Sequence, residues 1–176
     1  SSSALLASAW TSGDSSASAA LASSTPSWTA SAASPVASFD SDAAFAACDG
    51  GAVLVSTDAG KSWGYVNLGL PEAVLACCDF RCVSAFENHV WVAGRPGGFV
   101  LHSADLGKTW EIQKTPLHVP ANGIHFLDAN TGWLVADFGN ILGTTDGGKT
   151  WTVQRTGGQN AAALFLHASG KSAPLA

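Results

Sequence analysis

The sequence predicts an all-β protein and, within that class, a β-propeller made of four-stranded antiparallel blades. An eight-residue motif recurs three times, at intervals close to the length of one blade. Short apolar and β-branched runs alternate with turns rich in Gly, Asp and Asn, and no helical periodicity interrupts them. The chain contains 19 Gly and 7 Trp, a composition that suits tight turns and aromatic repeat positions.

The recurring motif reads Ser/Thr-x-Asp-x-Gly-Lys-Ser/Thr-Trp and occupies residues 56–63, 103–110 and 144–151. Its aspartates are Asp58, Asp105 and Asp146. Their spacing matches the usual length of a propeller blade, which is roughly 40–45 residues. Three copies in phase therefore indicate at least three consecutive blades.

An aromatic residue at a second fixed position supports the same period. Phe45, Trp91 and Trp133 precede the motif tryptophans of their own repeats by intervals that agree to within one position. Trp10 and Trp28 are separated by the same interval. This pair predicts a degenerate blade at the start of the chain, in which the motif has lost its Asp and Gly.

The blades follow in chain order. Residues 1–32 are predicted to form the degenerate blade, residues 33–70, 74–116 and 119–157 three further blades, and residues 158–176 the start of another blade or a tail. In the last full blade, strands are expected at 123–127, 133–136, 141–144 and 151–154. In the blade before it, they are expected at 83–86, 90–93, 99–102 and 110–113. About four blades thus lie in this chain. We expect them to belong to a larger propeller of roughly six to eight blades, with a closed ring of four blades as the alternative.

The motif residues have a structural logic. The aspartates sit in hairpin turns and can accept hydrogen bonds from backbone N–H groups two or more residues on. The glycines supply the positive φ that such a turn needs, and the tryptophans can pack flat against the blade. Each carboxylate belongs to its own blade, so a paired acid–base site is not expected. The structural residues are Asp58, Gly60, Trp63, Asp105, Gly107, Trp110, Asp146, Gly148 and Trp151.

Composition excludes several classes of partner. The formal net charge is −5, with 8 Lys and Arg and no basic stripe, so nucleic acid is not expected as a partner. No apolar run is long enough for direct membrane insertion. About two-thirds of residues 1–38 are Ser or Ala, which indicates either a low-complexity linker or letters that stand for unidentified side chains. The absence of Met suggests a processed chain, a fragment or an incompletely known sequence.

The four cysteines, Cys48, Cys77, Cys78 and Cys82, do not have a standard zinc spacing. Adjacent cysteines on a strand would point to opposite faces and would be poor joint ligands. We interpret them as small buried hydrophobic residues, with a disulfide as the main alternative and a metal site as a lesser one. No cofactor and no metal are predicted.

The motif residues resemble the Asp box, also called the bacterial neuraminidase repeat, of a large group of propellers. Within that group, residues 123–135 and 139–151 look like the photosystem II stability/assembly factor type of propeller. The resemblance covers roughly residues 36–156. It implies a non-enzymatic scaffold, usually located outside the cytoplasm in the periplasm, a lumen or at the cell surface. Such a scaffold holds a protein partner, which here could be a subunit of a membrane complex.

Three functions remain open at this point. A protein-binding or assembly scaffold is favoured, because propellers present loops and a central channel to partners. A glycan-binding protein or a sialidase-like glycoside hydrolase is the second, because many Asp-box propellers are such enzymes. The third is a structural repeat module of a larger surface or secreted protein. Under each of the three hypotheses, the remaining blades of the propeller are also expected as binding partners, whether they come from the same chain or another.

The enzyme hypothesis lacks a catalytic constellation. A sialidase-like site would need three arginines and a Tyr nucleophile, and the chain has Arg81, Arg95, Arg155 and Tyr65. Tyr65 and Arg155 follow motif tryptophans and are expected on outer strands, so these residues should not converge. No catalytic residue is predicted, and the sequence favours a non-enzymatic role.

Candidate partner-binding residues are those expected in loops: Arg81, Arg95, His118 and Phe138. His125 and His167 lie in apolar strands and are interpreted as core histidines rather than ligands. His102, directly before a motif, receives the same interpretation.

Overall fold

The computed structural model describes residues 36–38 and 42–157. By its internal contacts the chain splits into Ser1–Ser31 and Ala32–Ala176, and all described residues belong to the second unit. The predicted degenerate blade at 1–32 and the predicted start of a blade at 158–176 lie outside the described residues.

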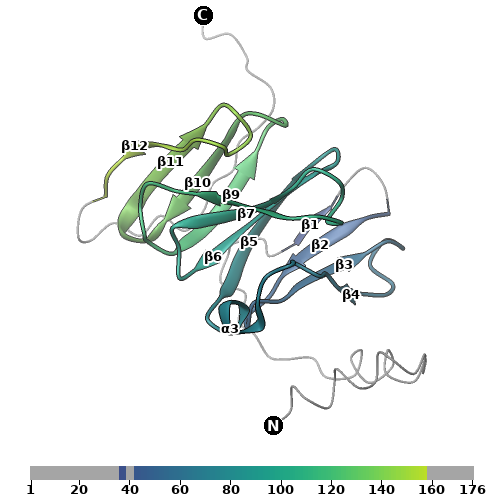
Figure 1. The fold of residues 1–176 in the computed structure, drawn as a ribbon. Coiled ribbons are helices and arrows are strands. Elements are labelled where there is room, and N and C mark those ends of the chain that lie inside the picture. Colours follow the sequence, from purple (N-terminus) through teal and green to yellow (C-terminus); the bar gives the residue numbers. More distant parts are fainter. Residues whose placement is uncertain (1–35, 39–41, 158–176) are drawn as a thin grey trace, which may run out of the picture. The chain divides into compact units, whose positions relative to one another are not determined.

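The described residues form three four-stranded antiparallel sheets, which confirms the predicted all-β propeller architecture (Figure 1). The first sheet contains β1 (Val36–Ser38), β2 (Ala44–Ala47), β3 (Val53–Ser56) and β4 (Gly64–Tyr65). The middle sheet contains β5 (Asp79–Phe86), β6 (His89–Arg95), β7 (Phe99–Ser103) and β8 (Glu111–Lys114). The third sheet contains β9 (Ala121–Phe126), β10 (Gly132–Ala136), β11 (Asn140–Thr144) and β12 (Thr152–Arg155). In each sheet the strands are neighbours in chain order.

Each sheet is a meander because tight turns join consecutive strands. Gly50 and Gly51 have positive φ in the turn between β2 and β3, as do Gly97 and Gly98 between β6 and β7. Only residues without a Cβ adopt such angles at little cost. The first strands of adjacent sheets, β1 with β5 and β5 with β9, pack against one another. The three blades are therefore joined along their first strands.

Two short helical turns were not expected from the sequence. The helix α3 (Glu72–Leu75) follows Pro71 in the connection between the first two sheets, and η1 (Asp137–Gly139) forms the turn between β10 and β11. Each is too short to show a helical repeat in the sequence. No helix in the described segments is long and apolar enough to cross a membrane.

The helix α3 corrects the interpretation of the cysteines. Cys77 and Cys78 follow α3 rather than lying on a strand. Cys78 and Cys82 are buried as predicted, whereas Cys77 is exposed, contrary to the prediction, and all four thiols are free. Burial raises the pKa of Cys82 to about 12.

The core lies in two seams, one on each side of the middle sheet. The strand β6 shows why, because Val90 and Val92 join the cluster shared with the first sheet. Trp91 and Ala93 join the cluster shared with the third sheet. All four side chains are fully buried, and burying one such Val contributes roughly 1.5–3 kcal/mol. A strand buried on both faces reads as a continuous apolar run rather than an alternating one.

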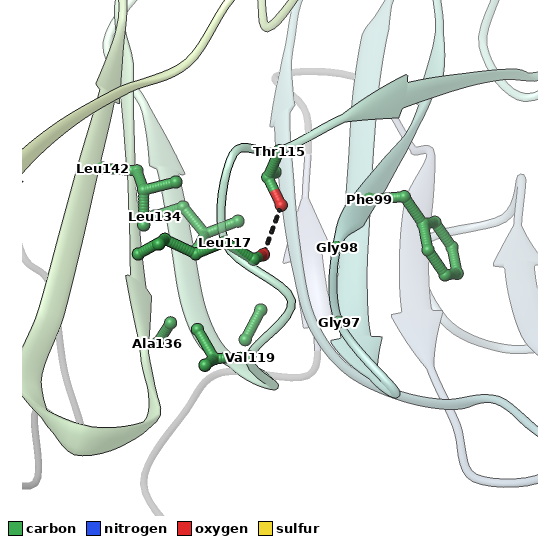
Figure 2. A pocket seen from close by; sticks show the side chains of 10 residues that line it. Gly97, Gly98, Phe99, Thr115, Leu117, Val119, Leu134, Ala136 and Leu142 are labelled. Carbon is green, nitrogen blue, oxygen red and sulfur yellow. Dashed lines mark hydrogen bonds between the residues drawn. The ribbon is translucent and has the colours of Figure 1, made fainter.

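The segment 115–120 closes the seam between the middle and third sheets (Figure 2). Leu117 and Val119 pack against the cluster of this seam. The depression around them is lined by Gly97, Gly98, Phe99, Thr115, Leu117, Val119, Ala121, Leu134, Ala136 and Leu142. The hydroxyl of Thr115 donates to the carbonyl of Leu117 at 2.9 Å. The depression is therefore an apolar packing seam and offers no group for chemistry.

Candidate partner-binding surface

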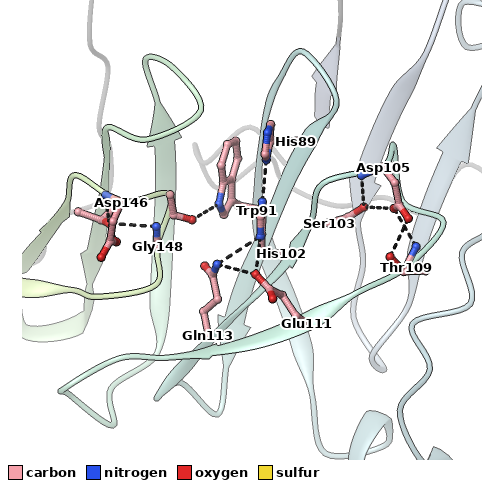
Figure 3. A network of polar contacts seen from close by, with 12 residues as sticks. His89, Trp91, His102, Ser103, Asp105, Thr109, Glu111, Gln113, Asp146 and Gly148 are labelled. Carbon is pink, nitrogen blue, oxygen red and sulfur yellow. Dashed lines mark hydrogen bonds and ion pairs between the residues drawn. The ribbon is translucent and has the colours of Figure 1, made fainter.

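The Asp boxes occupy one end of the three sheets, which we call the box end, in the turns between β3 and β4, β7 and β8, and β11 and β12. Asp105 accepts the backbone N–H of Thr109 at 2.8 Å and its hydroxyl at 2.6 Å (Figure 3). The hydroxyl of Ser103 donates to the same carboxylate at 2.8 Å. Asp58 and Asp146 make the corresponding bonds to Ser62 and Thr150.

These bonds determine the charge state of the boxes. The pKa of each box aspartate is lowered to about 2, first by the hydroxyl donated from the residue four positions on and then by its backbone N–H. The three carboxylates are ionised at neutral pH and their oxygens are engaged in their own turns. None is arranged to exchange a proton with another.

The box tryptophans differ in burial. The indole N–H groups of Trp63 and Trp110 donate to the carbonyls of Gly60 and Gly107 at 3.2 and 3.0 Å. Trp151 is 6% exposed, whereas Trp63 is 38% exposed, so the blades do not cover the box tryptophans equally. The glycines Gly60, Gly107 and Gly148 have φ values of 82°, 79° and 92°.

The four candidate binding residues lie at the other end of the sheets, which we call the loop end. Its segments are the start of β5, the turn between β6 and β7, the segment 115–120, and η1. Thr115 N–H donates to the carbonyl of Gly98 at 3.0 Å, and Asp137 N–H to that of Pro120 at 2.9 Å. The loop end is therefore one connected surface that spans the middle and third sheets.

Arg81 is not in a loop, contrary to its assignment from the sequence. It lies in β5, where the pairing with β6 shifts between Phe80 and Cys82, so Arg81 is the extra residue of a β-bulge. Asn122 is the skipped residue of a matching shift in β9. Arg81 and Asn122 precede the box aspartates of their own blades by the same number of positions. Bulges re-aim side chains and are frequent beside functional sites.

The two bulges bring three polar side chains together across the seam. The guanidinium Nη1 of Arg81 donates to Oδ1 of Asn122 at 3.5 Å. The amide Nδ2 of Asn122 donates to Oδ1 of Asp137 at 2.7 Å. Asn122 and Asp137 were not predicted, although the shared spacing of Arg81 and Asn122 from the box was available in the sequence.

The remaining candidates are exposed on the same end. Arg95 ends β6 and is exposed. His118 is exposed and its ring covers Gly98, where a Cβ would lie 2.5 Å from Nδ1. Phe138 is 60% exposed and has a left-handed φ of 61° within η1. The structure brings these three residues to one surface without hydrogen bonds among them.

The residues of the sialidase-like alternative do not converge. Tyr65 lies on β4 and Arg155 on β12, the last strands of different sheets, and Arg81 lies on the first strand of the middle sheet. Within residues 36–38 and 42–157, no group of three or more His, Cys, Asp or Glu could hold a metal ion.

Comparison with known proteins identifies a family and a fold. Residues 28–152 match the family model described as photosynthesis system II assembly factor YCF48. A solved structure described as YCF48 bound to D1 peptide matches with a TM-score of 0.61 and 23% identity, covering 67% of this chain and 38% of that one. YCF48 from Cyanidioschyzon merolae matches with a TM-score of 0.57 and 26% identity, covering 64% and 35%. The chain thus spans less than two-fifths of either structure. No curated protein matches.

Proposed function

The chain belongs to the photosynthesis system II assembly factor YCF48 family, and we propose that it is a non-enzymatic scaffold whose loop end holds a peptide segment of a partner protein. One similar structure is described as bound to a D1 peptide, which supports a peptide of this kind as the occupant. A subunit of a membrane complex is the corresponding source of the peptide.

Arg81 carries the proposal. Its side chain is half-buried, and its hydrogen bond to Asn122 is long at 3.5 Å. In the described part of the chain the only salt bridge joins His102 and Glu111, so no carboxylate there pairs with Arg81. A guanidinium has five N–H donors in a planar fork that suits a carboxylate or backbone carbonyls. Arg81 therefore has donors to offer to a peptide.

The neighbouring residues suit the same occupant. Phe138, the residue after Asp137, offers an exposed aromatic ring, and Arg95 adds a second guanidinium at the end of β6. Aromatic and Arg side chains are the most common anchors of protein interfaces. A peptide with a carboxylate and an apolar side chain would contact a guanidinium group with the first and the ring of Phe138 with the second.

Binding of a labelled D1 peptide, measured by fluorescence anisotropy, tests this function. We expect Arg81→Gln to weaken binding at least about tenfold, which is about 1.4 kcal/mol. Arg155→Gln is the matched control, because Arg155 is an exposed arginine on β12, and β10 and β11 separate that strand from β9. Circular dichroism would verify that both variants fold. Equal affinities for the wild type and Arg81→Gln would contradict the role of Arg81, and no measurable binding by the folded wild type would contradict the function.

We also propose that a further blade covers the face of the third sheet that bears Trp133. At the first seam, Phe45 packs so closely on the box of the middle sheet that a Cβ on Gly107 would lie 2.7 Å from its ring. At the second seam, Trp91 Nε1 donates to the carbonyl of Gly147, in the box of the third sheet, at 2.9 Å. Trp133 occupies the same position in β10, paired with His125 and Gly143. If the same contact recurs, Trp133 packs against the Asp box of a following blade.

A location outside the cytoplasm is a further proposal, supported by the resemblance of the repeat to extracytoplasmic propellers. Cell fractionation with an antibody against the natural protein tests it. Recovery with a periplasmic, lumenal or surface fraction would support the proposal, and recovery with cytoplasmic markers would contradict it.

A further inference from the structure

A row of aromatic rings crosses the seam between the middle and third sheets, and its members on the middle sheet, His89, Trp91 and His102, are drawn in Figure 3. Trp91 on β6 is fully buried and stacks on Phe126 of β9, with ring centroids 3.6 Å apart. On the middle sheet Trp91 also stacks with His89 and His102, at 5.5 and 5.1 Å. The two imidazoles are nearly parallel, at 5°. Two titratable rings therefore belong to the aromatic packing of a seam.

The two histidines are also joined by hydrogen bonds. His89 Nδ1 lies 2.9 Å from His102 Nε2, and His102 Nδ1 lies 2.8 Å from Glu111 Oε1. The amide Nε2 of Gln113 donates to the same carboxylate oxygen at 3.0 Å. His102 is 7% exposed, and both of its ring nitrogens have hydrogen-bond partners. Nε2 contacts the imidazole of His89, and Nδ1 contacts the carboxylate of Glu111.

The rings of His89 and His102 can hold only a limited number of protons in this arrangement. With both rings neutral, His102 donates from Nδ1 to Glu111 and accepts at Nε2 from His89 Nδ1–H. One added proton is accommodated when His102 Nε2–H donates to His89 Nδ1, between a carboxylate and a neutral imidazole. A second added proton would place N–H groups on both sides of the 2.9 Å contact. That state must break the contact and separate the rings.

The row is connected to the docking of the third sheet. Trp91 donates to the carbonyl of Gly147, and Gln113 lies so close to Gly148 that a Cβ there would be 2.2 Å from Gln113 Oε1. Both glycines belong to the Asp box of the third sheet. Movement of the histidine rings would therefore be transmitted to this box through Trp91 and Gln113.

We propose that His89, His102 and Glu111 form a pH-sensitive joint that weakens the seam between the middle and third sheets when both histidines become protonated. This joint goes beyond the proposed binding function and does not depend on it. The charged groups that face it are Glu87 beside His89, Glu111 on β8, and Lys149 in the box of the third sheet. From β9 the facing side chain is Phe126, which carries no charge.

The direction of the pH effect follows from His89. Burial lowers the pKa of His89 below 6.5, and His102 beside it lowers the pKa further, while Glu87 acts in the opposite direction. Because the folded state binds the proton less well than the unfolded chain, the contribution of His89 is complete above about pH 6.5 and is lost as pH falls below it.

Histidine NMR and thermal unfolding on the 176-residue chain test the joint. We expect the His89 resonances to titrate below the ordinary histidine pKa of 6.5. We also expect the wild-type unfolding temperature to fall by about 2–4 °C more between pH 7 and 5 than that of His89→Asn. In that variant the amide keeps a donor near the Nδ1 position but does not titrate.

His118→Gln is the matched control, because it removes an exposed histidine at the loop end of the same sheets and should retain the wild-type pH dependence. His89→Phe separates ring stacking from titration, since it retains a ring against Trp91 and should also flatten the pH profile. Parallel pH profiles for the wild type and both His89 variants would overturn the proposal. So would wild-type His89 resonances that titrate above pH 6.5, a result that requires no variant to fold.

Discussion

Asp105 illustrates at the scale of one residue how a turn and a charge depend on each other. Its carboxylate accepts three hydrogen bonds from Ser103 and Thr109, and these bonds lower its pKa to about 2 from 3.8. Folding therefore favours the ionised form. The resulting stabilisation is present above the ordinary pKa and is lost as pH falls through 3.8 toward 2.

We expect Asp105→Ala to lower the unfolding temperature at neutral pH, because the N–H of Thr109 and two hydroxyls lose their acceptor. The variant should also lose less stability than the wild type between about pH 4 and pH 2. Thermal unfolding by circular dichroism measures both effects. Asp49→Ala, an exposed aspartate in the turn between β2 and β3, is the control and should follow the wild type. If Asp105→Ala has the same unfolding temperatures as the wild type across this pH range, the proposed role of the Asp105 hydrogen bonds is contradicted.

At the scale of strands, the β9–β10 pair shows how a missing side chain positions a seam. Gly132 on β10 is paired with Phe126 on β9, and a Cβ on Gly132 would lie 2.6 Å from the Phe126 ring. The ring occupies that space, and this leaves its face free to stack on Trp91. One residue without a side chain thus positions the contact between two sheets.

Gly132→Ala should therefore reduce the free energy of unfolding by about 1–3 kcal/mol, through overpacking against Phe126. Urea denaturation is the suitable measurement. Gly64→Ala on β4 is a matched control, since no atom lies within 4 Å of the position of its Cβ. The control is expected to be neutral or stabilising by up to about 1 kcal/mol. A loss of stability in Gly64→Ala equal to that in Gly132→Ala would contradict the overpacking argument.

At the scale of the whole molecule, the seams follow one rule. The aromatic residue on the second strand of each blade contacts the Asp box of the next, as Phe45 and Trp91 do. The proposed cover for Trp133 extends that rule to the third sheet. Uncovered apolar faces drive association, so the face around Trp133 would affect how the chain behaves in solution.

We expect the chain to self-associate in solution through the face that bears Trp133, and Trp133→Lys to reduce this association. Static light scattering at several concentrations measures the mass of the species against that of a monomer. Phe138→Lys is the control, because Phe138 is also aromatic and is 60% exposed, whereas Trp133 is half-buried, and because Phe138 lies at the loop end. A wild-type chain that remains monomeric at high concentration would contradict the proposal.

The candidate site was only partly predictable. Arg95, His118 and Phe138 were found because Gly and Pro around them predict turns, and turns are local. Arg81 was assigned to a loop because a β-bulge leaves no local signal beyond its repeated distance from the box. Its neighbours Asn122 and Asp137 come from the next sheet, a whole blade further along the chain. Contacts between residues so far apart in the chain cannot be predicted from sequence motifs of a few residues.

The histidine joint was missed for the same reason. His102, directly before a motif, was interpreted as a core histidine rather than a ligand. Its partners His89 and Glu111 lie on the flanking strands β6 and β8, and antiparallel pairing brings them within hydrogen-bonding distance. The sequence indicated a buried histidine and could not indicate with whom it shares a proton.

By itself, the sequence determined the all-β class, the period of the blade and the turns that contain the Asp boxes. All of these depend on interactions among residues close in the chain: a carboxylate with an N–H four residues on, or a glycine with its own φ. Only the tertiary structure decided which side chains meet across a seam, such as Arg81 with Asn122, or Trp91 with Gly147. Those contacts depend on the packing of one sheet against the next, and a repeat with a regular period does not specify them.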